Sequence, residues 1–225
     1  MSIQDTYLTL QSRTEGIYRE KGSKFHAYAF PCSSEEAFHA TLLEIKKIHP
    51  KARHHCYAYR LDLPGDRFRY NDDGEPSSSA GRPIYNAILS AELFRSGVIV
   101  VRYFGGTKLG IPGLIHAYRT AGEEAIKENQ IVKEVIVGYI KLAFDYKIYG
   151  SVMGMLNQKN INIHDTSLDL SPYIIGSVPL SEVASTIDAC KAHLLGYDVS
   201  DIKEDTQHPD CHISEIDLKI DVENQ

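Results

Sequence analysis

The sequence predicts an α+β protein of two domains that meet near residue 130. Two patterns predict this fold class. In the first, an apolar, β-branched strand at residues 98–103 runs into a glycine-rich loop and then into a helix. In the second, residues 135–203 follow the order βαββαβ, which is typical of a ferredoxin-like module. A chain of 225 residues that is 43% hydrophobic is long enough to bury a sizeable core.

The first domain is predicted to span residues 1–131. Apolar or alternating segments between turn residues predict strands at 17–20, 24–30, 55–61, 67–70 and 98–103. Lys21-Gly22-Ser23 is the expected turn of a hairpin. Helices are expected from a capping box that begins at Ser33, from Pro83 at a first helical turn, and from an apolar repeat. Their predicted ranges are 33–48, 83–94 and 114–128.

The second domain is predicted to span residues 132–205. Its expected strands are 135–144, 161–170, 173–178 and 198–203, and its expected helices are 147–159 and 182–195. Residues 206–225 are acidic, and two outcomes stay open for them: a frayed tail or an extra edge strand.

Charge is distributed unevenly along the chain. Residues 1–132 carry 17 Lys and Arg against 15 Asp and Glu, whereas residues 133–225 carry 7 against 15. All ten arginines lie at or before Arg119. Because arginine is well suited to binding phosphate and carboxylate groups, a surface for a polyanion is expected on the first domain. The net charge of this first half is, however, nearly neutral, whereas a typical nucleic-acid-binding domain is strongly basic.

Several classes of protein are disfavoured. No apolar run approaches the roughly 20 residues that span a bilayer, and the N-terminus lacks the apolar core of a signal peptide, so a cytoplasmic protein without membrane contact is expected. The four cysteines show no zinc-ligand spacing, which favours reduced structural thiols. No pattern predicts a cofactor.

The loop after the strand at 98–103 is the first candidate site. A strand, a glycine-rich loop and a helix start together direct backbone N–H groups toward one point, which suits an anion. Its spacing matches neither the P-loop nor the dinucleotide fingerprint, because Leu109 follows Lys108. Its glycines would let a ligand approach the backbone closely. These glycines are Gly105, Gly106, Gly110 and Gly113.

A cationic patch is the second expectation for the first domain. Lys24, Arg60, Arg102 and Lys108 all fall on or just after predicted strands and could share one sheet face or edge. Aromatic residues lie between them, as in a platform for phosphates and stacked bases. The alternative is a solvated sheet face whose long side chains cover the core. The aromatic residues are Phe25, Tyr57, Tyr59 and Tyr103.

An acidic segment and a histidine pair offer alternatives. Asp72, Asp73 and Glu75 could bind a divalent cation, or could order their loop by pairing with Arg82 or Arg102; ordinary turn chemistry is favoured over metal binding. His54-His55-Cys56 could supply zinc ligands or a Cys–His pair, but packed or surface side chains are favoured, and no metal is predicted. The serines at 77–79 lack the Gly-x-Ser-x-Gly elbow of a hydrolase.

Longer motifs resemble the Impact family. They include Gly22-Ser23-Lys24-Phe25 and the segment His54 to Arg60. They also include Asp72-Asp73-Gly74-Glu75-Pro76, Ala80-Gly81-Arg82-Pro83-Ile84, and the segment Val100 to Gly110 with Gly113-Leu114. The similarity covers roughly residues 15–205 and is strongest to bacterial two-domain members. It implies a first domain similar to domain four of elongation factor G and a second similar to domain five.

The resemblance also implies a function. Eukaryotic relatives are translation regulators that act through protein partners; bacterial members have no settled activity, and the resemblance implies nucleic-acid or ribosome binding for them. The expectation is therefore a non-enzymatic, translation-related regulator that binds RNA, the ribosome or a ribosome-associated protein through its first domain. Two alternatives stay open: a protein-interaction regulator without nucleic-acid contact, and an enzyme for a phosphorylated or peptide substrate at the glycine-rich loop.

Three positions depart from the family's usual pattern. Ser78-Ser79 replaces Gly-Thr, Pro112 replaces Gly, and His116 replaces Arg. Pro112 removes an N–H group and His116 reduces positive charge at neutral pH, so a tight phosphate cradle is disfavoured here. The chain also extends further beyond Asp205 than the resemblance implies.

Overall fold

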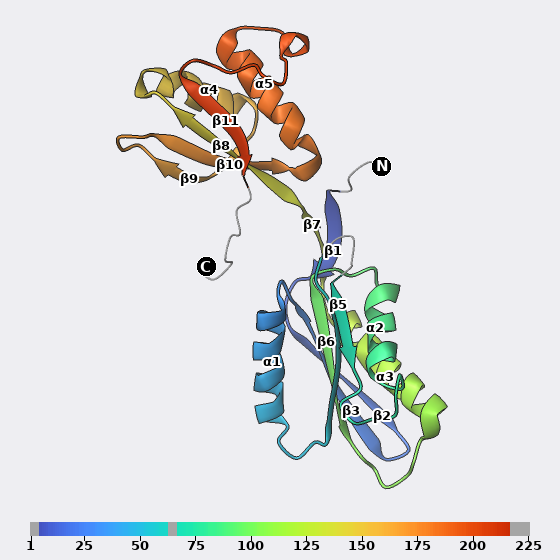
Figure 1. Cartoon of the computed structure of the whole chain (residues 1–225). Helices are drawn as coiled ribbons and strands as arrows, with labels where there is room; N and C mark the ends of the chain where they lie inside the picture. The colour runs from blue at the N-terminus through green and yellow to red at the C-terminus, as the bar shows by residue number, and fades with distance from the viewer. Residues whose placement is uncertain (1–4, 63–66, 217–225) are drawn as a thin grey trace. The chain divides into compact units, whose positions relative to one another are not determined.

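The computed structural model describes residues 5–62 and 67–216, and they form two compact units (Figure 1). One unit spans Tyr7–Glu134, and the other contains residues 5–6 together with the described residues 135–216. Helices and antiparallel sheets occur in both units, which confirms the α+β class. The likeness to elongation factor G domains stays a prediction. No helix in the described ranges is long and apolar enough to span a membrane.

The unit Tyr7–Glu134 is built on a five-stranded sheet in the order β2-β3-β6-β4-β5. Every neighbouring pair in this sheet is antiparallel. β2 and β3 are joined by Lys21 and Gly22, both with positive φ, as the two-residue type I′ turn of a hairpin requires. The strands are β2 (Thr14–Glu20), β3 (Ser23–Pro31), β4 (His54–Arg60), β5 (Phe68–Asn71) and β6 (Ser96–Tyr103).

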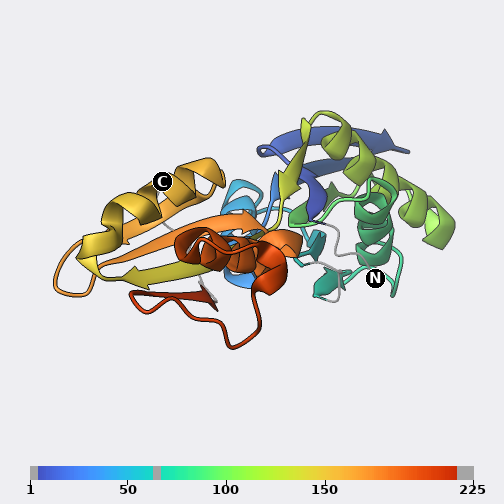
Figure 2. The same ribbon diagram turned by 90° about the horizontal axis from the view of Figure 1, so that it is seen from above.

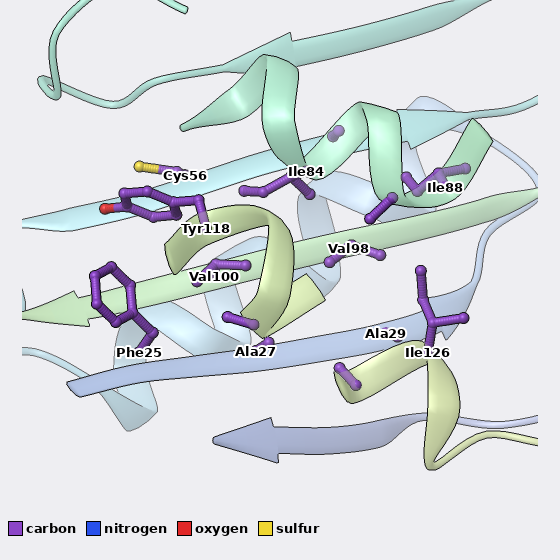
Figure 3. Close-up of a cluster of buried hydrophobic side chains, with 14 of the residues drawn as sticks. Phe25, Ala27, Ala29, Cys56, Ile84, Ile88, Val98, Val100, Tyr118 and Ile126 are labelled. Carbon is purple, nitrogen blue, oxygen red and sulfur yellow. The ribbon is translucent and has the colours of Figure 1, made fainter. Parts of the chain in front are cut away.

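Helix α1 (Glu35–Ile48) covers one face of this sheet, and α2 (Gly81–Ser90) and α3 (Gly110–Lys127) lie side by side on the other (Figures 1 and 2). The face toward α2 and α3 is lined with small residues, which lets two helices approach the strands closely (Figure 3). The face toward α1 carries large aromatic rings instead. The small residues include Ala27, Ala29 and Ala58, and the rings include Tyr28, Phe30, Tyr57 and Tyr59.

The predicted helix boundaries need correction. The N-cap of α1 is Ser34, whose hydroxyl accepts a hydrogen bond from the Ala37 N–H, and not Ser33. α2 ends at Ser90 and not near residue 94, because Leu93 instead forms a bridge with Leu8 of β1 (Thr6–Leu10). β1 in turn pairs with β7 (Ile131–Val135) in a two-stranded sheet. α3 begins four residues earlier than expected, at Gly110.

The other unit contains a four-stranded sheet in the order β11-β8-β10-β9. The chain order β8, α4, β9, β10, α5, β11 is that of the predicted ferredoxin-like module. Both helices pack on one face, against Ile140, Leu142 and Ile174. The elements are β8 (Val137–Phe144), α4 (Tyr149–Gln158), β9 (Asn162–Ser167), β10 (Tyr173–Pro179), α5 (Val183–Leu195) and β11 (Cys211–Ile216).

The fourth strand of this module was predicted in the wrong place. Residues 198–203 contain only the short 3₁₀ helix Val199–Asp201, and the strand that pairs with β8 is Cys211–Ile216. Alternate residues Cys211 and Ile213 point into the core, as a half-buried edge strand requires. The second unit therefore continues beyond residue 205. The rest of the predicted acidic tail, residues 217–225, lies outside the described residues.

Candidate functional site: a cationic cleft beside the start of α3

A cleft of about 660 Å³ lies at the C-terminal end of β6 in the unit Tyr7–Glu134. Four segments line it: residues 51–54 after α1, the loop between β5 and α2, the end of β6, and the first turn of α3. All four belong to the same unit, so the cleft is formed by that unit alone.

A buried ion pair forms the base of the cleft. Arg102 Nη1 donates to Glu75 Oε1 at 2.6 Å, and the two side chains are only 8% and 4% exposed. The hydroxyl of Tyr118, from α3, donates to the same carboxylate oxygen at 2.8 Å. Burial, together with Cys56 and Glu75 nearby, raises the pKa of Tyr118, so it stays a neutral donor. Arg102 is therefore neutralised, and it is not a free cation for a ligand.

The rim of the cleft is both cationic and apolar. Lys51, Arg53 and Lys108 are exposed there, and the structure shows no ion pair for any of the three within the described residues. Phe104 is 60% exposed and lies 5.5 Å from the guanidinium of Arg102, and Ile111 is exposed beside it. An exposed ring next to three cations can contact both an apolar group and an anionic group of one ligand.

The N-terminus of α3 also faces this cleft through Gly110 and Ile111. The N-cap residue, Leu109, makes no side-chain capping bond, and the first turn contains no acidic residue. The positive end of an 18-residue helix is thus left without a protein carboxylate at this point. Pro112 lies within that first turn, where a backbone N–H has no partner inside the helix, so it costs the helix little.

The predicted acidic residues have structural roles. Asp72 accepts three backbone N–H bonds, from Ser78, Ala80 and Gly81, and thereby caps the start of α2. Asp73 accepts a bond from the N–H of His55 at 2.6 Å. With Glu75 bound to Arg102, each of the three carboxylates points to a different partner, and within the described ranges no group of His, Cys, Asp or Glu is arranged to hold a metal. Arg82 is exposed and does not pair with them.

The predicted cationic patch is divided by the sheet. Lys24 and Tyr103 pair across β3 and β6 on the face of α1, where the Tyr103 hydroxyl lies 3.0 Å from His49 Nδ1. Arg102 faces the opposite side, toward α2 and α3. Arg60 lies at the far end of β4, opposite Ser96, with its guanidinium 3.5 Å from the centre of the Phe94 ring. Of the four predicted cations, only Arg102 and Lys108 line the cleft.

The predicted stacking platform is wrong for three of its four rings. Phe25, Tyr57 and Tyr59 belong to the buried core and cannot accept a base, whereas Tyr103 is half-buried and lines the cleft. The exposed ring of the cleft is Phe104, which was not among the predicted site residues. Its signal was its position: it is the apolar residue that follows the last residue of a buried strand and directly precedes two glycines.

The glycines of the loop serve three different purposes. Gly105 lies against Gly22 of the β2–β3 turn so closely that a Cβ atom would collide with that backbone. Gly106 and Gly110 have positive φ, which favours glycine. Gly113 is inside α3, so it does not form part of a loop around a ligand. The glycines thus shape the cleft wall, and only Gly110 lines the cleft itself.

Two nucleophiles near the cleft, Cys56 and Ser79, are poorly placed for catalysis. Cys56 is buried, and burial raises the pKa of its thiol, which keeps it protonated. Ser79 is buried as well, and its hydroxyl donates to the Pro76 carbonyl. Neither group is therefore available for covalent chemistry, and the rim of the cleft suits an anionic ligand with an apolar part.

Comparison with known proteins points to one family. A family model described as "Impact N-terminal domain" matches residues 21–126. A Thermus thermophilus protein, "IMPACT family member in pol 5'region", is 39% identical over 148 residues, which is 65% of this chain and 78% of that protein. "IMPACT family member YigZ" of Escherichia coli is 27% identical over 166 residues, 73% of this chain and 81% of that protein.

A solved structure is similar over both units. It is described as "Crystal structure of an hypothetical protein", has a TM-score of 0.69 at 22% identity, and covers 96% of this chain and 99% of that one. At this identity the likeness concerns the fold.

Proposed function

Because the chain belongs to the IMPACT family, as its motifs predicted, we propose that it is a translation-related regulator that binds single-stranded RNA in the cationic cleft. The observation that carries this proposal is the composition of the rim. Three exposed cations, the start of a helix and an exposed phenylalanine ring surround one opening, and the carboxylate at its base is already paired. Phosphate and base are the two groups that such a rim accommodates together.

The chemistry assigns a role to each part of the rim. Lys108 and the free N–H groups at the start of α3 would bind one phosphate, and Lys51 and Arg53 would bind the next. Phe104 would stack on a base, and Ile111 would contact its edge. The cleft would bind RNA of many sequences, because every base presents a ring face and the phosphates carry no sequence information.

The test is binding of the full-length protein to a fluorescein-labelled, twelve-residue poly-uridine RNA, followed by fluorescence anisotropy at several salt concentrations. Three phosphate contacts should give a plot of log K against log salt with a slope of about −2. Lys108→Ala should weaken binding at every salt concentration and reduce the magnitude of that slope by about 0.7, the share of one contact on a single strand. Phe104→Ala should weaken binding about tenfold without changing the slope, because it removes stacking and no charge.

A matched control lies on the same helix. Lys127, at the other end of α3, is also exposed, and Lys127→Ala should leave both affinity and slope unchanged. Undetectable binding, or equal losses from Lys108→Ala and Lys127→Ala, would contradict the proposed RNA site.

A further inference from the structure

Strand β5 is the outermost strand of the five-stranded sheet, and no described strand pairs with its outer edge. Its four residues are Phe68, Arg69, Tyr70 and Asn71. Phe68 is 46% exposed and Tyr70 is 38% exposed, which is unusual for aromatic residues of a sheet. This edge is separate from the cleft, whose lining includes no residue of β5.

The backbone of β5 has hydrogen-bonding groups that point outward. The Leu61 N–H donates to the Arg67 carbonyl, and the register then pairs Tyr59 with Arg69 and Tyr57 with Asn71. In an antiparallel ladder, bonded pairs alternate with pairs that do not exchange bonds. Phe68 and Tyr70 occupy the alternate positions, so their N–H and C=O groups face away from β4 and are available to another strand.

The side chains of β5 differ between its two faces. On the side of α2, Phe68 stacks on Tyr85 with ring centres 4.8 Å apart, and Tyr70 lies 6.0 Å from Tyr85. On the opposite face, Arg69 is exposed across from Tyr59. Arg69 lies on the face of α1, where Glu35 from the first turn of that helix also lies near Tyr59. Among the described residues, no ion pair joins Arg69 to Glu35. The edge is therefore apolar on the side of α2, where neither β5 nor α2 has an acidic residue, and carries one exposed arginine on the other side.

The opposite edge of the same sheet is built differently. β2 carries Glu15, Arg19 and Glu20, and charged residues on an edge discourage pairing with another chain. α3 also packs tightly on β2, where the Cα of Gly16 lies against the backbone of Ala125. Within β5, by contrast, Arg69 is the one charged residue.

We propose that β5 binds an extended peptide segment of a partner protein by strand addition, and that this segment alternates acidic and apolar residues. A strand directs successive side chains to opposite faces, so the apolar residues would contact Phe68 and Tyr70 while the carboxylates face Arg69. The peptide backbone would bond to Phe68 and Tyr70. Base stacking explains this surface less well, because the Phe68 ring already stacks on both Tyr70 and Tyr85.

The test uses three fluorescein-labelled peptides and the full-length protein. The first alternates Glu and Val over eight residues, the second replaces each Glu with Lys, and the third is the first peptide with N-methyl groups on alternate residues. The acidic peptide should bind at least about tenfold more tightly than the lysine peptide, because only it complements Arg69. The N-methylated peptide should lose most of the affinity, because it cannot complete the backbone ladder.

Two substitutions of Tyr70 distinguish the contribution of its backbone N–H to peptide binding from that of its ring. Tyr70→Ala removes the ring alone, whereas Tyr70→Pro also removes the outward N–H without breaking a bond to β4. Binding of the acidic peptide should fall with Tyr70→Ala and fall further, by at least about fivefold, with Tyr70→Pro. Circular dichroism would verify that both variants remain folded.

Lys108→Ala, in the cleft, should leave peptide binding unchanged. The proposal is overturned if the acidic peptide does not bind, if all three peptides bind equally, or if Tyr70→Pro binds as well as Tyr70→Ala. Displacement of the acidic peptide by the poly-uridine RNA in the Lys108→Ala variant would also overturn it, because the edge would then be a nucleic-acid surface.

Discussion

An arginine lies against an aromatic ring near each end of β6, yet the two arginines have different surroundings. At the C-terminal end, Arg102 is buried, bound to Glu75, and forms the base of a cleft with three exposed cations. At the N-terminal end, Arg60 of β4 lies over Phe94 and bonds to the Leu93 carbonyl at 3.5 Å. Both strand arginines therefore stabilise the fold, whereas the cations available to a ligand lie in the loops.

The largest expected effect is at Arg102. Arg102→Met should lower the free energy of unfolding by about 3–5 kcal/mol, because it leaves the Glu75 carboxylate buried without its partner. Urea denaturation of the full-length protein measures the change. The double variant Arg102→Met, Glu75→Gln should recover most of the loss. A loss below about 1 kcal/mol for Arg102→Met would contradict a buried pair.

The next effect concerns the wall of the same cleft. Gly105→Ala should cost about 2–3 kcal/mol, since its Cβ would meet the backbone of Gly22, which cannot move aside as a side chain can. Gly106→Ala is the matched control: it meets no atom within 4 Å and should cost only about 1 kcal/mol, from its positive φ. Thermal unfolding of both variants tests the order, and equal costs would rule out the contact with Gly22 as the cause.

At the opposite end of β6, a smaller loss is expected. Arg60→Met should lower the free energy of unfolding by about 1 kcal/mol, because the methionine side chain retains packing on Phe94 and loses the cation–π contact. RNA binding, measured as above, should be unchanged. A clear loss of RNA affinity in this variant would instead place Arg60 on the binding surface, as predicted from the sequence.

The smallest effect is a pH dependence near the Tyr103 end. Burial lowers the pKa of His26, His49 and His55, so the folded protein keeps them neutral to lower pH than the unfolded chain does. The unfolded chain then binds more protons below about pH 6.5, and stability should fall as the pH decreases from 7 to 5.5. His49→Gln should flatten this slope, whereas Arg60→Met should not. A free energy of unfolding that stays constant or rises as the pH decreases from 7 to 5.5 would contradict the lowered pKa of these histidines.

Local patterns were sufficient to predict much of the fold. The β2–β3 turn followed from Gly22, and the ferredoxin-like order followed from alternating strand and helix segments in the second half. The last strand was misplaced because residues 198–203 contain apolar residues close to α5. Which segment pairs with β8 depends on the long connection to Cys211, which no local signal defines.

The candidate site was harder to predict, because it depends on register and strand order. Lys24 and Arg102 lie at the same end of the sheet, but a difference of one residue in register decides which face each occupies. Arg60 was separated from both because β4 runs antiparallel to β6, which places its last residue beside the first residue of β6. Sequence alone gives neither the order of the strands nor their directions.

The three backbone bonds to Asp72 have a consequence for ligand binding. They fix Ser78, Ala80 and Gly81 to the end of β5, and so hold the segment that carries Glu75 and Pro76 in one conformation. One wall of the cleft is thus preorganised. Binding of a ligand there would cost little conformational entropy in that protein segment. The affinity would depend mainly on how well the shape and charges of the ligand match the opening.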